Sequence, residues 1–291
     1  CPDEAKAVLE SASQRKIGGS QLHGNLAMVA LAQGDMAALD RELAALKGTP
    51  QGELTILSTE MSLAASHGQM RRARELTARI IEALHRLNLN EGEAAMLAQV
   101  AMLEAAFRNR SRAVEQATKA LNSSHSPDVT ISAAAALALA GSDKKARDLV
   151  ADVAERRPED TIVQYVSVPT VQAILEMNRG DYAKANQLMN AGSPYDRVNP
   201  GSRYIRAEAY RLSGRSKEAV QEYEQILNLR SFMPTDPVLS LAHLGLARAY
   251  AAEGDKSKSR IAYQNFLALW KDADPDIPLF KEAQTEYAKL Q

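Results

Sequence analysis

The chain has 291 residues, and its 35 Lys and Arg against 36 Asp and Glu leave a formal net charge of -1 at pH 7. So small a net charge gives no general attraction to nucleic acid or to an anionic membrane, and any electrostatic partner must be met by a local patch. Hydrophobic residues make up 45% of the chain but aromatic residues only 5%. Small aliphatic side chains of this kind suit closely packed helices and argue against a sheet sandwich.

The single cysteine, Cys1, excludes an intrachain disulfide framework and a site built from several cysteines. The sequence contains no uninterrupted apolar run of about 18 residues, so we expect no segment that inserts into a membrane. The first residues also lack the charged and apolar regions of a signal peptide. A chain that begins at Cys1 fits either a lipid-anchored protein or a piece of a longer one.

A turn residue followed five positions later by a small or apolar residue recurs along the chain. The pairs are Gly34 with Leu39, Gly68 with Ala73, Arg108 with Ala113, Gly141 with Ala146, Gly180 with Ala185, Gly214 with Ala219, and Gly254 with Ser259. The intervals between successive turn residues are 34, 40, 33, 39, 34 and 40 residues. This period predicts a stack of helix-turn-helix units.

Taken in order, residues 1–18 read as the second helix of an incomplete repeat. Residues 19–271 read as about seven hairpins, and 272–291 as a capping helix, all in one solenoid. First helices are predicted at 20–33, 53–67, 92–107, 128–140, 169–179, 200–213 and 238–253. Second helices are predicted at 36–47, 69–87, 111–122, 143–156, 182–191, 216–229 and 256–271, before a closing helix at 278–290. No segment alternates with the period of a strand, so the fold class is an all-α, right-handed α-solenoid.

Every second connection between hairpins is long, with the additional residues at 86–91, 158–161 and 231–236. These loops would lie along one edge of a solenoid, where they could form a binding rim. The alternative is that they only lengthen helices or relieve strain between stacked pairs.

Two stretches carry a family resemblance, RAEAYRLSGRSKEAVQEYEQIL at 206–227 and LGLARAYAAEGDKSKSRIAYQNFLALW at 244–270. A small residue, an aromatic, a Gly-Asp turn and a further alanine make this pattern similar to the tetratricopeptide repeat. The units near Gly34 and Arg108 are degenerate. RPEDTIVQY, SPYD, YIRAEAY and the closing LWKDADPDIPLFKEAQTEYAKLQ further resemble the C-terminal repeat region of bacterial, acidobacterial-type serine/threonine protein kinases and related regulators.

The resemblance implies a sensor or scaffold array carried behind a kinase or DNA-binding domain. The chain itself contains no glycine-rich phosphate loop, no His-Arg-Asp loop and no Asp-Phe-Gly motif. We therefore predict that it is not an enzyme, and that any kinase activity would lie in a domain outside it.

Other chemistry finds no support in the sequence. The five histidines never occur four residues apart with a carboxylate between them, so a helical zinc motif is absent. Asp272, Asp274 and Asp276 alternate like the start of a calcium loop, but Ile277 and Ala283 stand where glycine and glutamate are needed, and Asp276 is a better candidate to cap the closing helix. No glycine-flanked nucleophile turn occurs. We predict no catalytic residue, no metal and no cofactor.

The concave face of such a solenoid is lined by first helices and is the expected binding surface. In the earlier units it would present Ser58, Ser62, Ala98, Met102, Ile131, Ala135, Thr170, Ile174 and Met177. Later units offer Tyr204, Glu208, Arg211 and Arg248, with Glu208 within reach of Arg211 or Arg248. Met102, Met177 and these four residues are the predicted partner-binding set. A structural bridge between repeats is the alternative for the charged ones.

A second candidate is a basic edge at the start of successive second helices. It comprises Arg71, Arg72, Arg74, Arg110, Arg112, Lys144, Lys145 and Arg147. The edge could hold an anionic partner, although solvated, acid-paired side chains are the alternative. Aromatic residues for base stacking are missing from it, which argues against single-stranded nucleic acid.

The sequence therefore predicts a non-catalytic module that binds a protein or peptide and not nucleic acid. Its first interpretation is the sensor or scaffold region of a bacterial kinase signalling protein, whose parent could itself be anchored in a membrane. A free-standing lipoprotein scaffold anchored through Cys1 is the alternative, and the compartment stays open.

Overall fold

A computed structural model describes residues 2–15, 17–195, 199–290 of the chain. These residues form sixteen α-helices and no strand. A single helix α1 (Pro2–Gln14) leads, and α16 (Pro278–Ala288) closes the chain. Between them lie seven hairpins: α2 (Gly19–Gln33) with α3 (Met36–Ala45), α4 (Pro50–Ser66) with α5 (Met70–Arg86), α6 (Asn90–Ala106) with α7 (Arg110–Ser123), α8 (Pro127–Leu139) with α9 (Asp143–Arg156), α10 (Val168–Asn178) with α11 (Tyr182–Gly192), α12 (Pro200–Leu212) with α13 (Ser216–Asn228), and α14 (Val238–Glu253) with α15 (Lys256–Leu269). The predicted bounds of the hairpin helices and of the closing helix lie within three residues of the observed ones, and the leading helix, predicted within 1–18, ends at Gln14.

The turn inside each hairpin is set by one residue in the left-handed region, which ends the first helix. Glycine occupies this position in six of the seven hairpins, for example Gly214 with φ 78° and Gly254 with φ 82°. Arg108 fills it in the α6/α7 hairpin with φ 66°. Asp255 follows Gly254 and caps α15 by accepting a hydrogen bond from the Lys258 amide at 3.0 Å. The repeat inferred from turn spacing is therefore confirmed at the backbone level.

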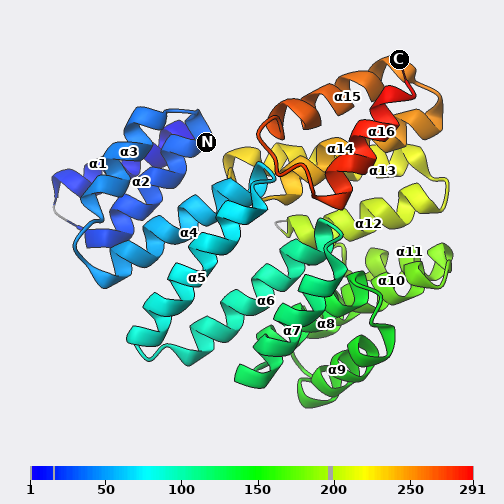
Figure 1. Cartoon of the computed structure of the whole chain (residues 1–291), viewed down its shortest axis with the longest axis horizontal. Helices are drawn as coiled ribbons and strands as arrows, with labels where there is room; N and C mark the ends of the chain where they lie inside the picture. The colour runs from blue at the N-terminus through cyan, green and yellow to red at the C-terminus, as the bar shows by residue number, and fades with distance from the viewer. Residues whose placement is uncertain (1, 16, 196–198, 291) are drawn as a thin grey trace.

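The hairpins stack so that successive first helices lie side by side from α6 through α8, α10 and α12 to α14, and each second helix packs on its own first helix (Figure 1). Small residues allow this close approach. All six residues from Ala133 to Ala138 in α8 are buried. The described residues therefore form an all-α solenoid with a layer of first helices and a layer of second helices.

The long connections take irregular forms. A five-residue π-helix, η1 (Val163–Ser167), precedes α10, and a short 3₁₀ segment, η2 (Leu229–Ser231), follows α13. The connection near residue 88 turns on Asn88, whose φ is 56°. The local winding of the chain thus differs among the three long connections.

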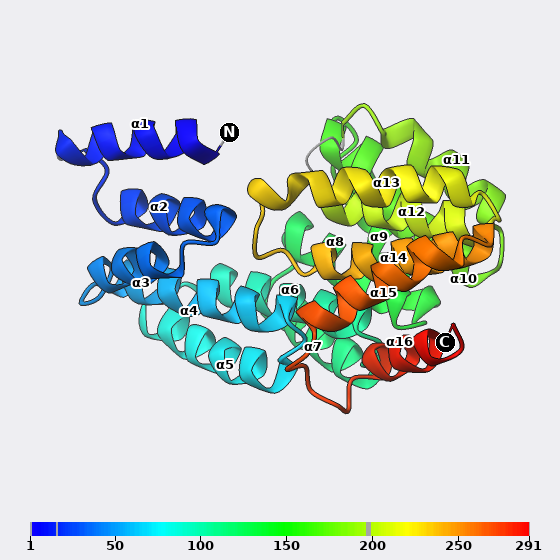
Figure 2. The ribbon, with the colours of Figure 1, turned by 90° about the horizontal axis from the view of Figure 1, so that it is seen from above.

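The solenoid closes on itself, which the sequence pattern does not predict. One hydrophobic core joins α4 and α5 to α12 through α16, although these segments are far apart in the chain. Figure 2 shows the C-terminal end of α15 lying against the α4/α5 hairpin. The fully buried Trp270 donates its indole N–H to the Ser66 carbonyl at 3.1 Å and packs edge-on against Phe107, with ring centroids 5.0 Å apart.

Polar contacts complete this closure. They join the end of α4 and the α4/α5 turn to α14 and to the segment before α16. The Ser240 hydroxyl donates to the Ser66 carbonyl at 2.6 Å, and the Asp274 amide donates to the Gly68 carbonyl at 3.0 Å. Asp274 in turn accepts from the Arg71 amide at 2.7 Å. Asp276 was predicted to cap α16, but it does not. Its carboxylate receives the Arg71 guanidinium at 2.9 Å, and Ile277 stands at the N-cap position without a side-chain hydrogen bond.

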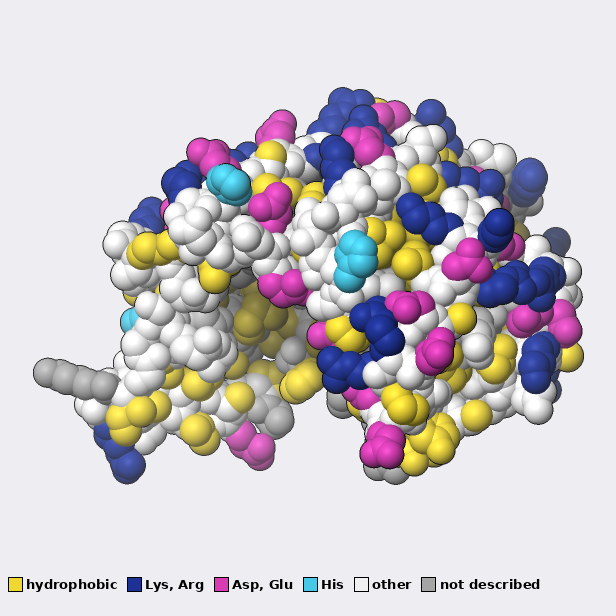
Figure 3. Space-filling view, turned by 90° about the horizontal axis from the view of Figure 1, so that it is seen from below, with side chains coloured by type: hydrophobic (Ala, Val, Ile, Leu, Met, Phe, Trp, Pro, Cys, Tyr) yellow, Lys and Arg dark blue, Asp and Glu magenta, His cyan; other side chains and the backbone are white. Residues whose placement is uncertain are grey.

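Helices α1, α2 and α3 project from this closed part of the molecule and contact it through α2, which meets α4 and η2. Figure 3 shows a hollow between the N-terminal helices and the remainder, with hydrophobic side chains at its base. On α1, which packs on α2, Val8 is 69% exposed. The N-terminal hairpin therefore extends the stack from α4 and touches its far end only where α2 meets η2.

Candidate functional site

The inner face formed by the first helices is more tightly packed than the sequence predicts. Ala98, Ala135 and Ile174 are buried, with 1%, 6% and 1% of their surface exposed, so they offer nothing to a partner. Met102 and Met177 are partly exposed and border a second hydrophobic core, which runs from α6 to α12. This face therefore presents a row of partly exposed apolar residues, among them Met102 and Met177.

Tyr204 and Glu208 lie together on α12, as predicted, in a network of buried polar groups. Glu208 accepts two hydrogen bonds from Arg211, at 3.0 and 2.7 Å, and one from the Tyr223 hydroxyl. The Tyr204 ring lies 6.0 Å from the Tyr223 ring. The Tyr204 hydroxyl makes no hydrogen bond within the described part of the chain. This network holds Tyr204 in a fixed position with its donor free.

The electrostatics of this network follow from its burial. Burial, and then the nearby Glu208 charge, raise the pKa of Tyr204, so its hydroxyl stays protonated. Burial alone would also raise the pKa of Glu208, but the charge and hydrogen bonds of Arg211, with help from Tyr223, outweigh it and hold that pKa below its usual value. Glu208 and Arg211 are therefore both charged, and the Glu208 carboxylate has its hydrogen-bond donors within the network.

Arg248 differs from the prediction that it stands free for a partner. Its guanidinium donates to both carboxylate oxygens of Glu286 on α16, at 2.9 and 3.0 Å, and also reaches Glu282 at 3.4 Å. Tyr263 donates to the same Glu286 carboxylate at 2.9 Å. Only 11% of the Arg248 side chain is exposed. Arg248 thus fastens the closing helix to α14, as the alternative of a bridge between repeats describes.

The basic edge divides into paired and unpaired parts. Arg71 contacts Asp274 and Asp276 in the closure, and Arg72 lies 3.4 Å from both Glu60 and Glu75. Lys145 reaches the Thr118 hydroxyl at 3.4 Å. Five members have no ion pair among the described residues: Arg110, Arg112, Lys144, Lys145 and Arg147. The structure therefore does not present the edge as a single free stripe.

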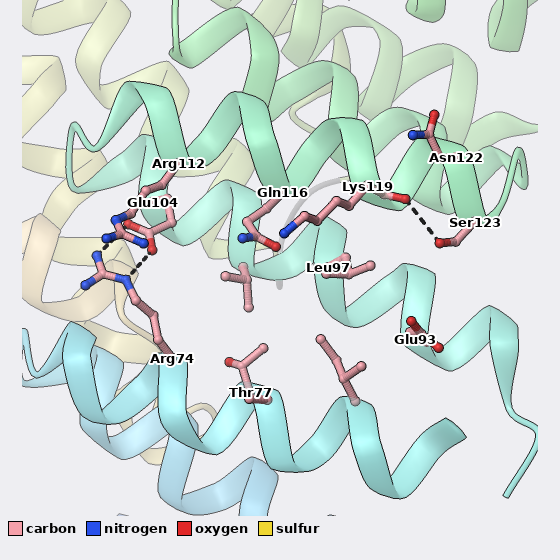
Figure 4. A pocket seen from close by; sticks show the side chains of 13 residues that line it. Arg74, Thr77, Glu93, Leu97, Glu104, Arg112, Gln116, Lys119, Asn122 and Ser123 are labelled. Atoms are coloured by element: carbon pink, nitrogen blue, oxygen red, sulfur yellow. Dashed lines mark hydrogen bonds and ion pairs between the residues drawn. The ribbon is translucent and has the colours of Figure 1, made fainter. Parts of the chain in front are cut away.

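Two members of the basic edge instead line a groove of about 550 Å³ between α5 and α7, with α6 as its floor. Arg74 enters from α5 and makes a two-pronged ion pair with the buried Glu104 of α6, at 2.7 and 2.9 Å. Asn109 also donates to Glu104, at 2.8 Å. Figure 4 shows Arg112 reaching down from α7 to the same end of the groove. The sequence patterns did not identify this groove, because it depends on how far α5 stands from α7.

Other chemistry is not evident in the described residues. No group of three or more His, Cys, Asp or Glu side chains there could hold a metal ion. Within the same residues, no helix combines the length and apolarity needed to cross a membrane. Cys1, the proposed lipid attachment point, lies outside the described residues.

Comparison with known proteins supports the repeat assignment. The sequence profile of the tetratricopeptide repeat matches residues 200–225. No curated protein sequence matches the chain significantly. Among solved structures, a tetratricopeptide repeat protein from Parabacteroides merdae aligns over 94% of this chain and 98% of its own, with a TM-score of 0.51 and 15% identity.

The human IFIT1 dimer with PPP-AAAA aligns over 100% of this chain and 69% of its own, with a TM-score of 0.55 and 13% identity. MamA AMB-1 aligns over 61% of this chain and 99% of its own, with a TM-score of 0.39 and 17% identity. At these identities the likeness concerns the fold. The chain therefore has the helical solenoid fold of tetratricopeptide repeat proteins and carries a recognisable copy of the repeat at residues 200–225.

Proposed function

We propose that residues 1–291 act as one protein-interaction scaffold whose inner face binds a segment of a partner protein. The observation that carries this proposal is a row of partly exposed apolar residues on adjacent first helices. Met102 on α6, Ile131 on α8, Met177 on α10 and Tyr204 on α12 all border the same core. Flexible methionine and a tyrosine with a free hydroxyl are side chains that suit recognition of another protein.

The charged members of the predicted set support the surface instead of contacting the partner. Glu208 and Arg211 position Tyr223 and Tyr204, and Arg248 holds the closing helix. Since these ion pairs are largely buried, the backbone under the row is pre-organised, and little ordering entropy is lost when a partner binds.

Selection of a displayed random peptide library on the whole chain tests this proposal. Met177→Glu places a charge in the row and is expected to weaken the selected peptides by about tenfold or more, because a charged side chain must then be desolvated. Met36→Glu is the matched control, since Met36 is 55% exposed on α3, away from the row. Equal loss in both variants, or none in either, would contradict an inner-face site.

The nature of the partner needs a separate test. We propose a protein partner and no nucleic acid, on the near-zero net charge and the lack of aromatic residues along the basic edge. Titration with a labelled single-stranded oligonucleotide should show no binding at physiological salt. Saturable binding with a steep salt dependence would contradict this part of the proposal.

We further propose that the scaffold belongs to a bacterial serine/threonine kinase signalling protein, with the lipoprotein scaffold as the alternative. The support is the resemblance of RPEDTIVQY and of the closing LWKDADPDIPLFKEAQTEYAKLQ to such regions. The reading frame of the parent gene upstream of Cys1 decides between them. Kinase motifs there support the first interpretation, and a short signal peptide ending at Cys1 supports the second.

A further inference from the structure

We propose that the groove between α5 and α7 is a second binding site, and that it takes an amphipathic helix of a partner protein. The groove is formed by second helices and the outward side of α6, so it is separate from the inner-face row. The helix it fits carries acidic residues in its first turn, an apolar stripe in its middle and basic residues in its last turn. This proposal goes beyond the inner-face scaffold and does not depend on it.

The floor of the groove sets the length of the occupant. Glu93, Leu97, Val100 and Glu104 line it from one side of α6 at helical spacing. Glu104 follows Glu93 by eleven positions, which corresponds to a rise of about 16 Å along an α-helix. A bound helix of about three turns spans this distance. Leu97 and Val100 are only 7% and 5% exposed, so the apolar surface in the middle of the groove is small and is shared with the partly exposed Ile81 of α5.

The two ends of the groove carry opposite charge. At one end Arg74 and Arg112 face the single carboxylate of Glu104, and Arg112 has no ion pair among the described residues. This end therefore offers one guanidinium, that of Arg112, without an ion pair. At the other end the Glu93 side chain lies 3.8 Å from the His85 ring and places a carboxylate in the lining. A ligand carboxylate would therefore bind at the Arg112 end and a ligand cation at the Glu93 end.

Charge and helix dipole select the same orientation. Acidic residues stabilise the first turn of a helix and basic residues its last turn. A helix with that order places its N-terminus at the C-terminal end of α6, and so lies antiparallel to α6 in the groove. Lys119 is held by Glu115 at 2.8 Å, so the far end is not made basic by it. An extended acidic segment would satisfy Arg112 but would leave Glu93 without a partner.

Binding of two designed peptides to the whole chain tests the inference. The forward probe is a labelled peptide of about three helical turns, with acidic residues first, a leucine stripe and basic residues last. The reversed probe exchanges only the acidic and basic ends. We expect fluorescence anisotropy to show the forward probe binding at least about tenfold more tightly than the reversed one. Equal affinity would overturn the proposal.

Two variants place the probe in the groove. Arg112→Glu should weaken the forward probe by about tenfold or more and narrow its advantage over the reversed one. Arg147→Glu makes the same charge change on α9 outside the groove and should leave both affinities unchanged. Equal effects of the two substitutions would overturn the assignment. Self-association of the free chain that Arg112→Glu abolishes would also overturn it, since the groove would then hold a second copy.

Discussion

Gly68 combines a positive φ with a close approach of other atoms, whereas the other turn glycines have the positive φ alone. Its φ is 72°, and a Cβ there would lie 2.7 Å from the Ala273 Cβ and 2.8 Å from the Trp270 ring. Gly214 has φ 78°, but a Cβ there would meet nothing within 4 Å. The two positions therefore separate backbone strain from the close approach that closes the solenoid.

We predict that Gly214→Ala lowers the free energy of unfolding by about 1 kcal/mol and Gly68→Ala by about 3 kcal/mol. Urea unfolding of both variants measures the difference. Trp270 is the one tryptophan of the chain, so its emission also reports the closure. It should shift to the red in Gly68→Ala and stay unchanged in Gly214→Ala. Equal destabilisation would show that the closure adds nothing to the strain.

Asp236, in the connection before α14, has a pKa that is raised by burial. Its carboxylate accepts the Val238 amide at 2.9 Å, but burial outweighs this hydrogen bond and raises its pKa above the ordinary 3.8. When the pKa of a carboxyl is raised in the folded state, the free energy of unfolding of the protein falls as the pH rises through that pKa.

We therefore predict that Asp236→Asn, which keeps an oxygen for the Val238 amide, raises the free energy of unfolding at pH 7 by up to about 1 kcal/mol. The gain should shrink as the pH falls and vanish below the ordinary pKa of 3.8. Urea titrations at several pH values provide the measurement. A gain that persists at acid pH would assign it to something other than the charge.

At the scale of elements, the closing helix is attached by ion pairs as much as by its apolar face. Glu286 receives Arg248 and Tyr263 from the two helices of the last hairpin, and Leu279 and Phe280 are buried below. Since Arg248 is only 11% exposed, removing one partner leaves a charge with little access to water.

A double-mutant cycle on Arg248→Met and Glu286→Leu should give a coupling energy of about 1–2 kcal/mol. The exposed pair of Arg72 and Glu75, 3.4 Å apart on α5, is the control. The same substitutions there should couple by less than about 0.5 kcal/mol. If both cycles gave the same value, burial of the Arg248 pair would not be the source of its strength.

At the scale of the whole molecule, two hydrogen bonds of the closure meet at the Ser66 carbonyl, at the C-terminal end of α4. Ser66 is the last residue of α4, and such carbonyls lack a partner within the helix. Two donors from the other end of the chain, the Ser240 hydroxyl and the Trp270 indole, satisfy it instead. Either donor alone still pairs the carbonyl.

The double variant Ser240→Ala, Trp270→Phe should thus lose about 1–3 kcal/mol beyond the sum of the single variants, because the buried carbonyl is then unsatisfied. A double-mutant cycle by urea unfolding measures this term. Small-angle scattering should show larger dimensions in the double variant alone. Additive losses would mean that water replaces both donors.

The sequence by itself determined the helical class, the period and the helix ends. These are local properties, since a left-handed turn residue and a small residue five positions later act within one hairpin. Even the substitution of Arg108 for glycine was visible, and its φ of 66° agrees with the pattern. The pairing of Glu208 with Arg211, three residues apart on one helix, was predictable for the same reason.

Only the tertiary structure decided which of these side chains remain available. Small rotations between hairpins add up over the stack. They decide whether Arg248 pairs with Glu286 or is left for a partner, and how far α5 stands from α7. Those rotations bring Ser66 to Trp270, more than half the chain away, and no local pattern encodes such a contact. The closed solenoid and the groove above α6 therefore follow from the summed geometry of all seven hairpins.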